Sequence, residues 1–164
     1  MCVEMTGPTA ALRYSHTQAA PLYLLILAIG VGMFVGAWFT PEQVGQIILL
    51  VSGGFMVLVA CCFRQLNVSD RGDQLLISFG PLPLLWRRVQ FSEIERVEQG
   101  RTTILDGWGV HLSPSGGVTW NLWGFDCVDV WYKKGTKVKK VRIGTDDPEG
   151  LELFLKQRMS PENG

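Results

Sequence analysis

Charged side chains are nearly absent from the first part of the chain: before residue 64, the only Asp, Glu, Lys or Arg residues are Glu4, Arg13 and Glu42. The stretches 21–39 and 44–63 contain none of these four residue types and no histidine. Each stretch is about 20 residues long, which is the length that a helix needs to cross the hydrocarbon core of a bilayer. We therefore predict two transmembrane helices, and the short connector 40–43 predicts that they form an antiparallel hairpin.

The chain also lacks the motifs of common enzyme classes. It has no G-x-S-x-G, no G-x-x-x-x-G-K-[ST] and no G-x-G-x-x-G. The four cysteines form no C-x-x-C and no zinc-type spacing with histidine, so we expect reduced thiols, with palmitoylation of Cys61 and Cys62 as the alternative. His111 is close to Ser113 in the sequence, but a catalytic triad is defined by the geometry of its residues and not by their presence in the sequence. We predict that the protein is not an enzyme and that it binds no cofactor or metal.

The few basic residues near the two apolar stretches predict an orientation. Arg13 precedes the first stretch, Arg64 and Arg71 follow the second, and the connector has no basic residue. Basic flanks stay in the cytoplasm, so we expect a multi-pass protein of the cytoplasmic (inner) membrane with both termini and the remaining domain in the cytoplasm. A cleaved signal peptide is the alternative for the first stretch, but residues 36–39 lack a small-x-small cleavage site.

The apolar stretches contain glycines at positions that suit helix packing. Small residues let two helices approach closely in a membrane, and Gly32 and Gly36 form a small-x-x-x-small pair. We predict that Gly32, Gly36, Gly53 and Gly54 pack inside the hairpin, with packing on another membrane subunit as the alternative. No ionisable residue lies at mid-depth, which argues against a transport or ion pathway.

From residue 64 onward the apolar residues alternate with polar ones, which is typical of short strands. Turn residues at 113–117 and 133–136 predict two β-hairpins, 108–112 with 118–122 and 128–132 with 137–143. The segment 146–149 predicts a helix start, with an acidic cap and a proline at the first helical position. The alternative, a cation site at Asp146, Asp147 and Glu149, does not match a calcium loop.

The predicted organisation is therefore an α+β membrane protein in four parts. A flexible tail (1–19) precedes the hairpin (20–63, with helices at about 21–39 and 44–63). The domain (64–160) contains about seven antiparallel strands in a sandwich or partly open barrel, capped by one C-terminal helix, and a short tail (161–164) follows.

Several short sequence segments resemble a known group of proteins. Residues 73–83, 94–97, 107–109 and 143–151 resemble small bacterial membrane proteins that have an N-terminal helix hairpin and a pleckstrin-homology-like (PH-like) domain. The resemblance implies an architecture and no activity, because PH-like folds carry lipid-binding, peptide-binding and scaffolding roles alike.

Two clusters in the domain are candidate contact surfaces. The basic cluster contains Lys133, Lys134, Lys137, Lys139, Lys140 and Arg142. We interpret it as a solvated hairpin with edge-protecting lysines, or alternatively as a contact for anionic lipid headgroups, although strand alternation predicts that it is split between the two faces of the sheet. The aromatic cluster is either core or a protein-binding patch and contains Trp108, Trp120, Trp123, Phe125 and Trp131.

These features favour a membrane-anchored interaction or scaffolding module. We expect it to bind a protein partner, a membrane complex or a second copy of itself at the cytoplasmic face. The alternative function is a sensor of anionic lipid surfaces that acts through the basic cluster. Neither the net charge of zero nor any motif predicts nucleic-acid binding.

Overall fold

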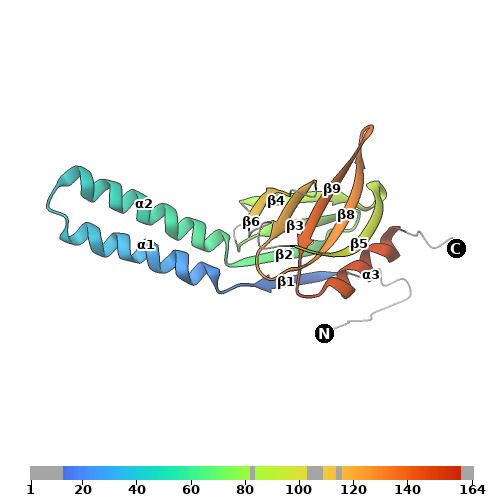
Figure 1. Ribbon diagram of the computed structural model, residues 1–164, viewed down its shortest axis with the longest axis horizontal. Coiled ribbons are helices and arrows are strands. Elements are labelled where there is room, and N and C mark those ends of the chain that lie inside the picture. Colours follow the sequence, from blue (N-terminus) through green and yellow to red (C-terminus); the bar gives the residue numbers. More distant parts are fainter. Residues whose placement is uncertain (1–12, 82–83, 103–108, 114–115, 160–164) are drawn as a thin grey trace.

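The computed structural model describes residues 13–81, 84–102, 109–113 and 116–159. A helical hairpin extends from one end of a β domain (Figure 1). In chain order, the elements are β1 (Ser15–Ala19), α1 (Leu22–Phe39), α2 (Gln43–Cys62), β2 (Gln65–Asp70), β3 (Gln74–Phe79), β4 (Leu85–Gln90), the 3-10 turn η1 (Phe91–Glu93), β5 (Ile94–Arg101), β6 (Gly109–Leu112), β7 (Val118–Asn121), β8 (Asp126–Lys134), β9 (Lys137–Gly144) and α3 (Pro148–Met159).

The two apolar stretches form the predicted helices. With 18 and 20 residues, α1 and α2 rise about 27 and 30 Å, close to the ~30 Å of a hydrocarbon core. The side chain of Glu42 starts α2 by accepting hydrogen bonds from the backbone N–H groups of Val44 (3.0 Å) and Gly45 (2.6 Å). Only 11% of the most apolar 18-residue stretch of each helix is buried, so neither helix resembles the core helix of a soluble protein. Both are long and apolar enough to cross a membrane.

The close contact between α1 and α2 is at Gly30 and Gly53. A Cβ atom on Gly53 would lie 3.1 Å from the carbonyl oxygen of Gly30, and one on Gly30 would lie 3.2 Å from that of Gly53. Of the four predicted glycines, Gly53 is part of this close contact, and a Cβ atom on Gly36 would be in ordinary van der Waals contact with Leu49 of α2 (3.8 Å). Gly32 and Gly54 do not contribute, since nothing lies within 4 Å of a Cβ atom at either position. The prediction selected glycines by their spacing along one helix. Which glycines meet the other helix depends on how both helices are rotated about their axes.

The helical hairpin is inserted into a β-hairpin. Strand β1 pairs with β2 along its whole length, from Ser15↔Ser69 to Ala19↔Gln65, and both helices lie between these strands in the sequence. The prediction of a flexible tail over 1–19 is therefore wrong for Ser15–Ala19, while residues 1–12 lie outside the described part. This strand was missed because it is a short edge strand with mostly polar side chains, stabilised by its ladder with β2 and not by an apolar face.

The described strands form two sheets, ordered β1-β2-β3-β4 and β5-β8-β9-β7-β6, with no closed barrel. There are nine described strands where about seven were predicted. Strands β6 and β7 and strands β8 and β9 form the two predicted hairpins. One pairing contradicts the all-antiparallel prediction, because β7 and β9 run parallel, with Val118↔Val141 and Trp120↔Ile143. Alternation identifies a strand but not its neighbour in the sheet.

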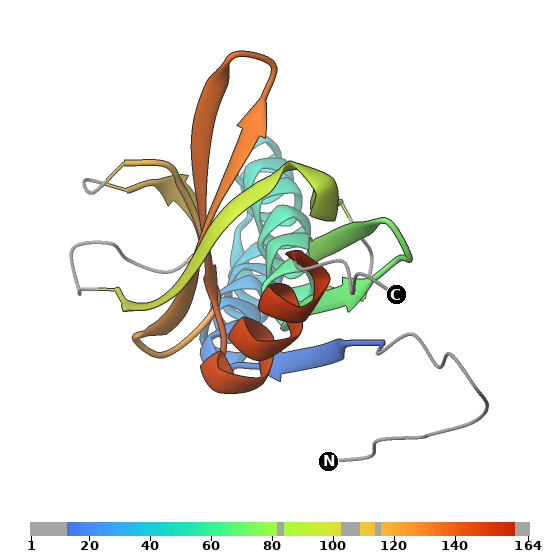
Figure 2. The same cartoon turned by 90° about the vertical axis from the view of Figure 1, so that its right-hand side faces the viewer.

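The C-terminal helix α3 packs on the β domain as predicted. Leu151, Phe154 and Leu155 are buried, and the ring of Phe154 stacks on that of Tyr14 with centroids 5.2 Å apart. The carboxylate of Asp147 accepts a hydrogen bond from the Gly150 backbone N–H (3.0 Å), which is the geometry of a helix cap. Figure 2, which views the domain from the end opposite the helices, shows α3 in front and the β8–β9 hairpin standing out above the sheets.

Candidate binding cleft along the edge of β9

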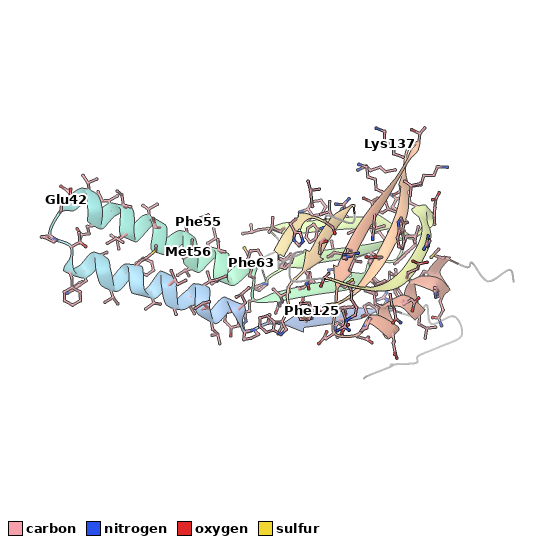
Figure 3. All side chains as sticks on the ribbon, viewed as in Figure 1. Glu42, Phe55, Met56, Phe63, Phe125 and Lys137 are labelled. Atoms are coloured by element: carbon pink, nitrogen blue, oxygen red, sulfur yellow. The ribbon has the colours of Figure 1, made fainter. Side chains whose placement is uncertain are left out.

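The β8–β9 hairpin carries the predicted basic cluster. Its strands close at the pair Lys134↔Lys137, and Gly135 at the turn has a φ of +65°, a conformation that glycine adopts without strain. In Figure 3, Lys137 lies at the tip of this hairpin, on the far side of the β domain from Phe63, where the helices end. The tip therefore points away from the helical hairpin.

The structure divides the basic cluster into two groups. Lys133, Lys134, Lys137 and Lys139 are exposed, whereas Lys140 is half-buried and Arg142 is buried.

Arg142 and Lys140 both contact one acidic side chain, Asp129 of β8. The Arg142 Nε atom lies 2.7 Å from Asp129 Oδ1, and the Lys140 Nζ atom lies 2.7 Å from Oδ2. Burial of the Asp129 carboxylate raises its pKa, but the hydrogen bonds and charges of Arg142 and Lys140 outweigh this effect, so that the pKa is lowered overall. Asp129 neutralises only one of these two cations, so the group keeps a net positive charge, and the exposed lysines add to it.

The predicted aromatic cluster is also divided. Trp120 is core, whereas Trp123 and Phe125 are partly exposed in the loop after β7, and Trp108 lies outside the described residues. The Trp131 ring lies under two cations, with Arg96 Cζ 4.6 Å and Lys140 Nζ 5.0 Å from its centroid. These side chains do not form one aromatic patch.

The half of β9 next to the turn has a free edge. Strand β7 pairs with β9 only from Val141 onward, and within the described ranges no strand pairs with Lys137–Lys140 on the side away from β8. Gly117, just before β7, lies beside Lys140, because a Cβ atom on Gly117 would lie 2.4 Å from the Lys140 carbonyl oxygen, so the open part of the edge is Lys137–Lys139. An unpaired edge offers backbone donors and acceptors to another extended chain.

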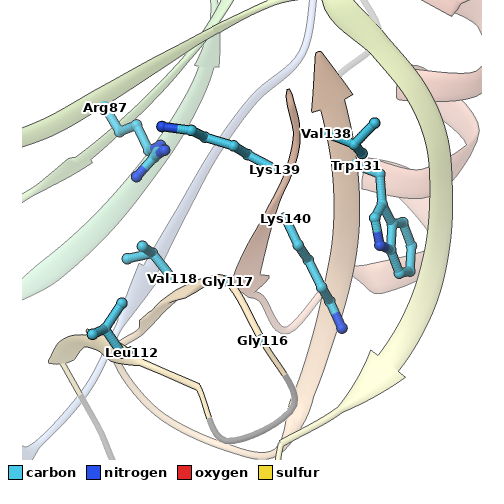
Figure 4. Close-up of a pocket in the computed structure, with 9 residues that line it drawn as sticks. All are labelled: Arg87, Leu112, Gly116, Gly117, Val118, Trp131, Val138, Lys139 and Lys140. Atoms are coloured by element: carbon cyan, nitrogen blue, oxygen red, sulfur yellow. The ribbon is translucent and has the colours of Figure 1, made fainter. Parts of the chain in front are cut away.

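A cleft of about 630 Å³ follows this free edge (Figure 4). It is lined by Arg87, Leu112, Gly116, Gly117, Val118, Trp131, Val138, Lys139 and Lys140. The guanidinium of Arg87 is held over the ring of Tyr132, with Cζ 5.6 Å from the centroid, and donates a hydrogen bond to its hydroxyl. The cleft thus combines three cations with exposed apolar side chains, of which Leu112 is 81% and Val138 56% exposed.

Sequence reasoning found only part of this cleft. It singled out Lys139, Lys140 and Trp131, but it missed Arg87 and Leu112, which come from β4 and β6 and are distant in the chain. No local signal in the sequence connects them with β9. The described residues contain no group of three or more His, Cys, Asp or Glu side chains that would hold a metal ion.

No family model, curated protein or solved structure matches this chain.

Proposed function

We propose that this protein is a membrane-anchored interaction module that presents the free edge of β9 to a protein partner. The observation that carries the proposal is the unpaired half of β9 inside a cleft of cationic and apolar side chains. Recognition by strand addition uses such an edge, since backbone hydrogen bonds give affinity and neighbouring side chains give specificity.

The anchor in this proposal is the α1–α2 hairpin crossing the cytoplasmic membrane. Its bare apolar surface supports the assignment, as do Trp38 and Phe39, which are largely exposed near the connector. The basic residues Arg64 and Arg71 favour a cytoplasmic β domain. A cysteine placed at Gln43 should then react with an impermeant reagent from outside intact cells, while one at Asp73 should not, and the reverse pattern would refute this orientation.

The partner in this proposal supplies an acidic, extended segment. Arg87 and Lys139 line the cleft and Lys137 lies on the free half of β9, so an acidic strand gains charge complementarity. A second copy of β9 would place lysines opposite lysines, which opposes pairing between copies. The chemistry of the cleft therefore favours a different protein over self-association through this edge.

Contact with anionic lipids through the basic hairpin is the second candidate. The four exposed lysines favour it, but the hairpin tip points away from the ends of α1 and α2 (Figure 3). Binding of the full chain in neutral nanodiscs to separate anionic vesicles, lost at high salt, would support this candidate, because exposed charges are screened within about 10 Å at 0.1 M salt.

A PH-like fold is the finer structural assignment within this proposal. Two sheets with a packed C-terminal helix favour it, whereas the parallel β7–β9 pair departs from a fully antiparallel arrangement. Such a fold is compatible with peptide binding.

The proposal is tested by photo-crosslinking in cells. A photoreactive amino acid at Val138 should crosslink the same partner as one at Leu112, since both line the cleft. The matched control is Leu153, which is exposed on α3 and outside the cleft. Lys137→Glu with Lys139→Glu should abolish the crosslink. Equal crosslinking from Leu153, or persistence after charge reversal, would refute the cleft as the binding site.

A further inference from the structure

The end of the β domain that faces the helices carries a rim of exposed apolar side chains. Leu84 is 57% and Trp86 53% exposed, and Leu85, at the start of β4, is also exposed. Trp123 and Phe125 are partly exposed in the loop after β7. We call these five residues the membrane-proximal rim. A soluble domain rarely exposes several large apolar side chains at one end without a surface to cover them.

The pairing register shows where the rim lies relative to the helices. One row of paired residues crosses the first sheet from Gln18 through Leu66 and Phe79 to Leu85. At the other end of this row, the Gln18 side chain donates a hydrogen bond to the Trp123 carbonyl oxygen (3.0 Å). Leu85 and Trp123 thus lie at opposite ends of one row, on two sides of the point where the helices leave the domain.

This row is close to the start of the apolar helices. Gln18 precedes Leu22, the first residue of α1, by four positions. Gly80, which lies between β3 and β4, contacts the end of α2. A Cβ atom on Gly80 would lie 2.9 Å from the Cys61 carbonyl oxygen. Since α1 rises about 27 Å against a hydrocarbon core of ~30 Å, the chain just before Leu22 is already at the edge of the core.

The rim has the side-chain chemistry of a membrane interface. Tryptophan is enriched at the headgroup level because its ring is amphipathic. The guanidinium of Arg88 lies over the ring of Trp86, 4.7 Å from its centroid, and that of Arg64 lies 6.0 Å from the ring of Tyr23, at the first turn of α1. Arginine next to an aromatic ring suits an anionic headgroup while its stem covers apolar surface.

We propose that the membrane-proximal rim enters the headgroup layer of the bilayer crossed by α1 and α2, and so fixes the β domain upright on the membrane. This inference rests on the proposed membrane anchoring. It assigns the lipid contact of the domain to the rim and leaves the β9 cleft open to a protein partner.

The test uses the full chain in nanodiscs that contain a lipid with a spin label on its headgroup, which quenches nearby tryptophans. Three single-tryptophan variants, with the other tryptophans changed to Phe, retain Trp38, Trp86 or Trp131. Trp38 reports on the connector end of the hairpin, and Trp131, in the outer half of β8, is the control. Quenching of Trp86 several-fold above that of Trp131, together with quenching of Trp38, supports the rim.

The other outcomes distinguish the membrane anchor from the membrane-proximal rim. Quenching of Trp38 with Trp86 at the level of Trp131 overturns the rim and leaves the anchor intact. No quenching of Trp38 overturns the anchor and the rim together. If a variant does not fold, the wild-type chain labelled with 5-fluorotryptophan gives the same comparison, from line broadening by a gadolinium headgroup lipid, with each signal assigned by one Trp→Phe change.

Discussion

Ala19, the last residue of β1, pairs with Gln65, the first residue of β2, although both apolar helices lie between them in the chain. Next to this pair, the backbone N–H of Ala20 lies 3.5 Å from the carbonyl oxygen of Arg64. The two strands of the β-hairpin are thus already close enough to be joined by a tight turn.

Replacing residues 20–64 with Asn-Gly should give a soluble β domain. Asn-Gly favours the two-residue turn that matches strand twist, and it would join Ala19 directly to Gln65. We expect a monomer that needs no detergent and has a β-rich circular dichroism spectrum. A chain that begins at Gln65 is the control and should melt lower, because it lacks β1 and the Tyr14 ring that stacks on Phe154. Equal melting temperatures would show that β1 adds no stability.

The ion pairs of Asp129 predict that replacing Arg142 lowers the free energy of unfolding strongly. Arg142→Met leaves the buried Asp129 carboxylate with Lys140 as its remaining cation, so we expect a loss of up to about 3 kcal/mol, the lower end of the cost of leaving a buried charge unpaired. The exposed Lys139 on the same strand is the control, and Lys139→Met should change the free energy of unfolding by less than ~0.5 kcal/mol. Urea unfolding in a neutral detergent measures both, and similar losses would contradict the role of Arg142.

Stability should also depend on pH through Asp129. Its pKa is lower in the folded protein than in the unfolded chain, where it is about 3.9. Below that value the unfolded state binds more protons, so this contribution to stability is present above about pH 4 and is lost as the pH falls through the folded pKa. Asp129→Asn should therefore lose less unfolding free energy than the wild type between pH 6 and pH 3. An identical loss in both proteins would assign the acid sensitivity to other groups.

The close contact between α1 and α2 predicts that substitutions at the adjacent residues Gly53 and Gly54 differ in their effect on stability. Gly53→Val would place side-chain atoms against the Gly30 carbonyl oxygen and the Cβ of Met33, which is 3.3 Å from a Cβ on Gly53. Overpacking of this kind costs about 1–3 kcal/mol. Gly54→Val should cost far less, because nothing lies within 4 Å of its Cβ position. The midpoint of unfolding on titration with SDS, followed by circular dichroism, compares them, and equal midpoints would place the contact elsewhere.

The sequence by itself determined the elements whose causes are local. Two uncharged stretches determined α1 and α2, since a helix satisfies its own backbone groups and its length is read from the chain. The start of α3 followed from Asp147 and Pro148 because capping acts within one turn. Gly135 marked the β8–β9 turn for the same local reason.

Only the tertiary structure decided how these elements meet. It added β1 to the first sheet, placed β9 parallel to β7, buried Arg142 against Asp129, and brought Arg87 beside Lys139 in one cleft. Each of these depends on which strand lies next to which. A period of two tells which side chains share a face, but strand neighbours are chosen by packing between residues that are far apart in the chain.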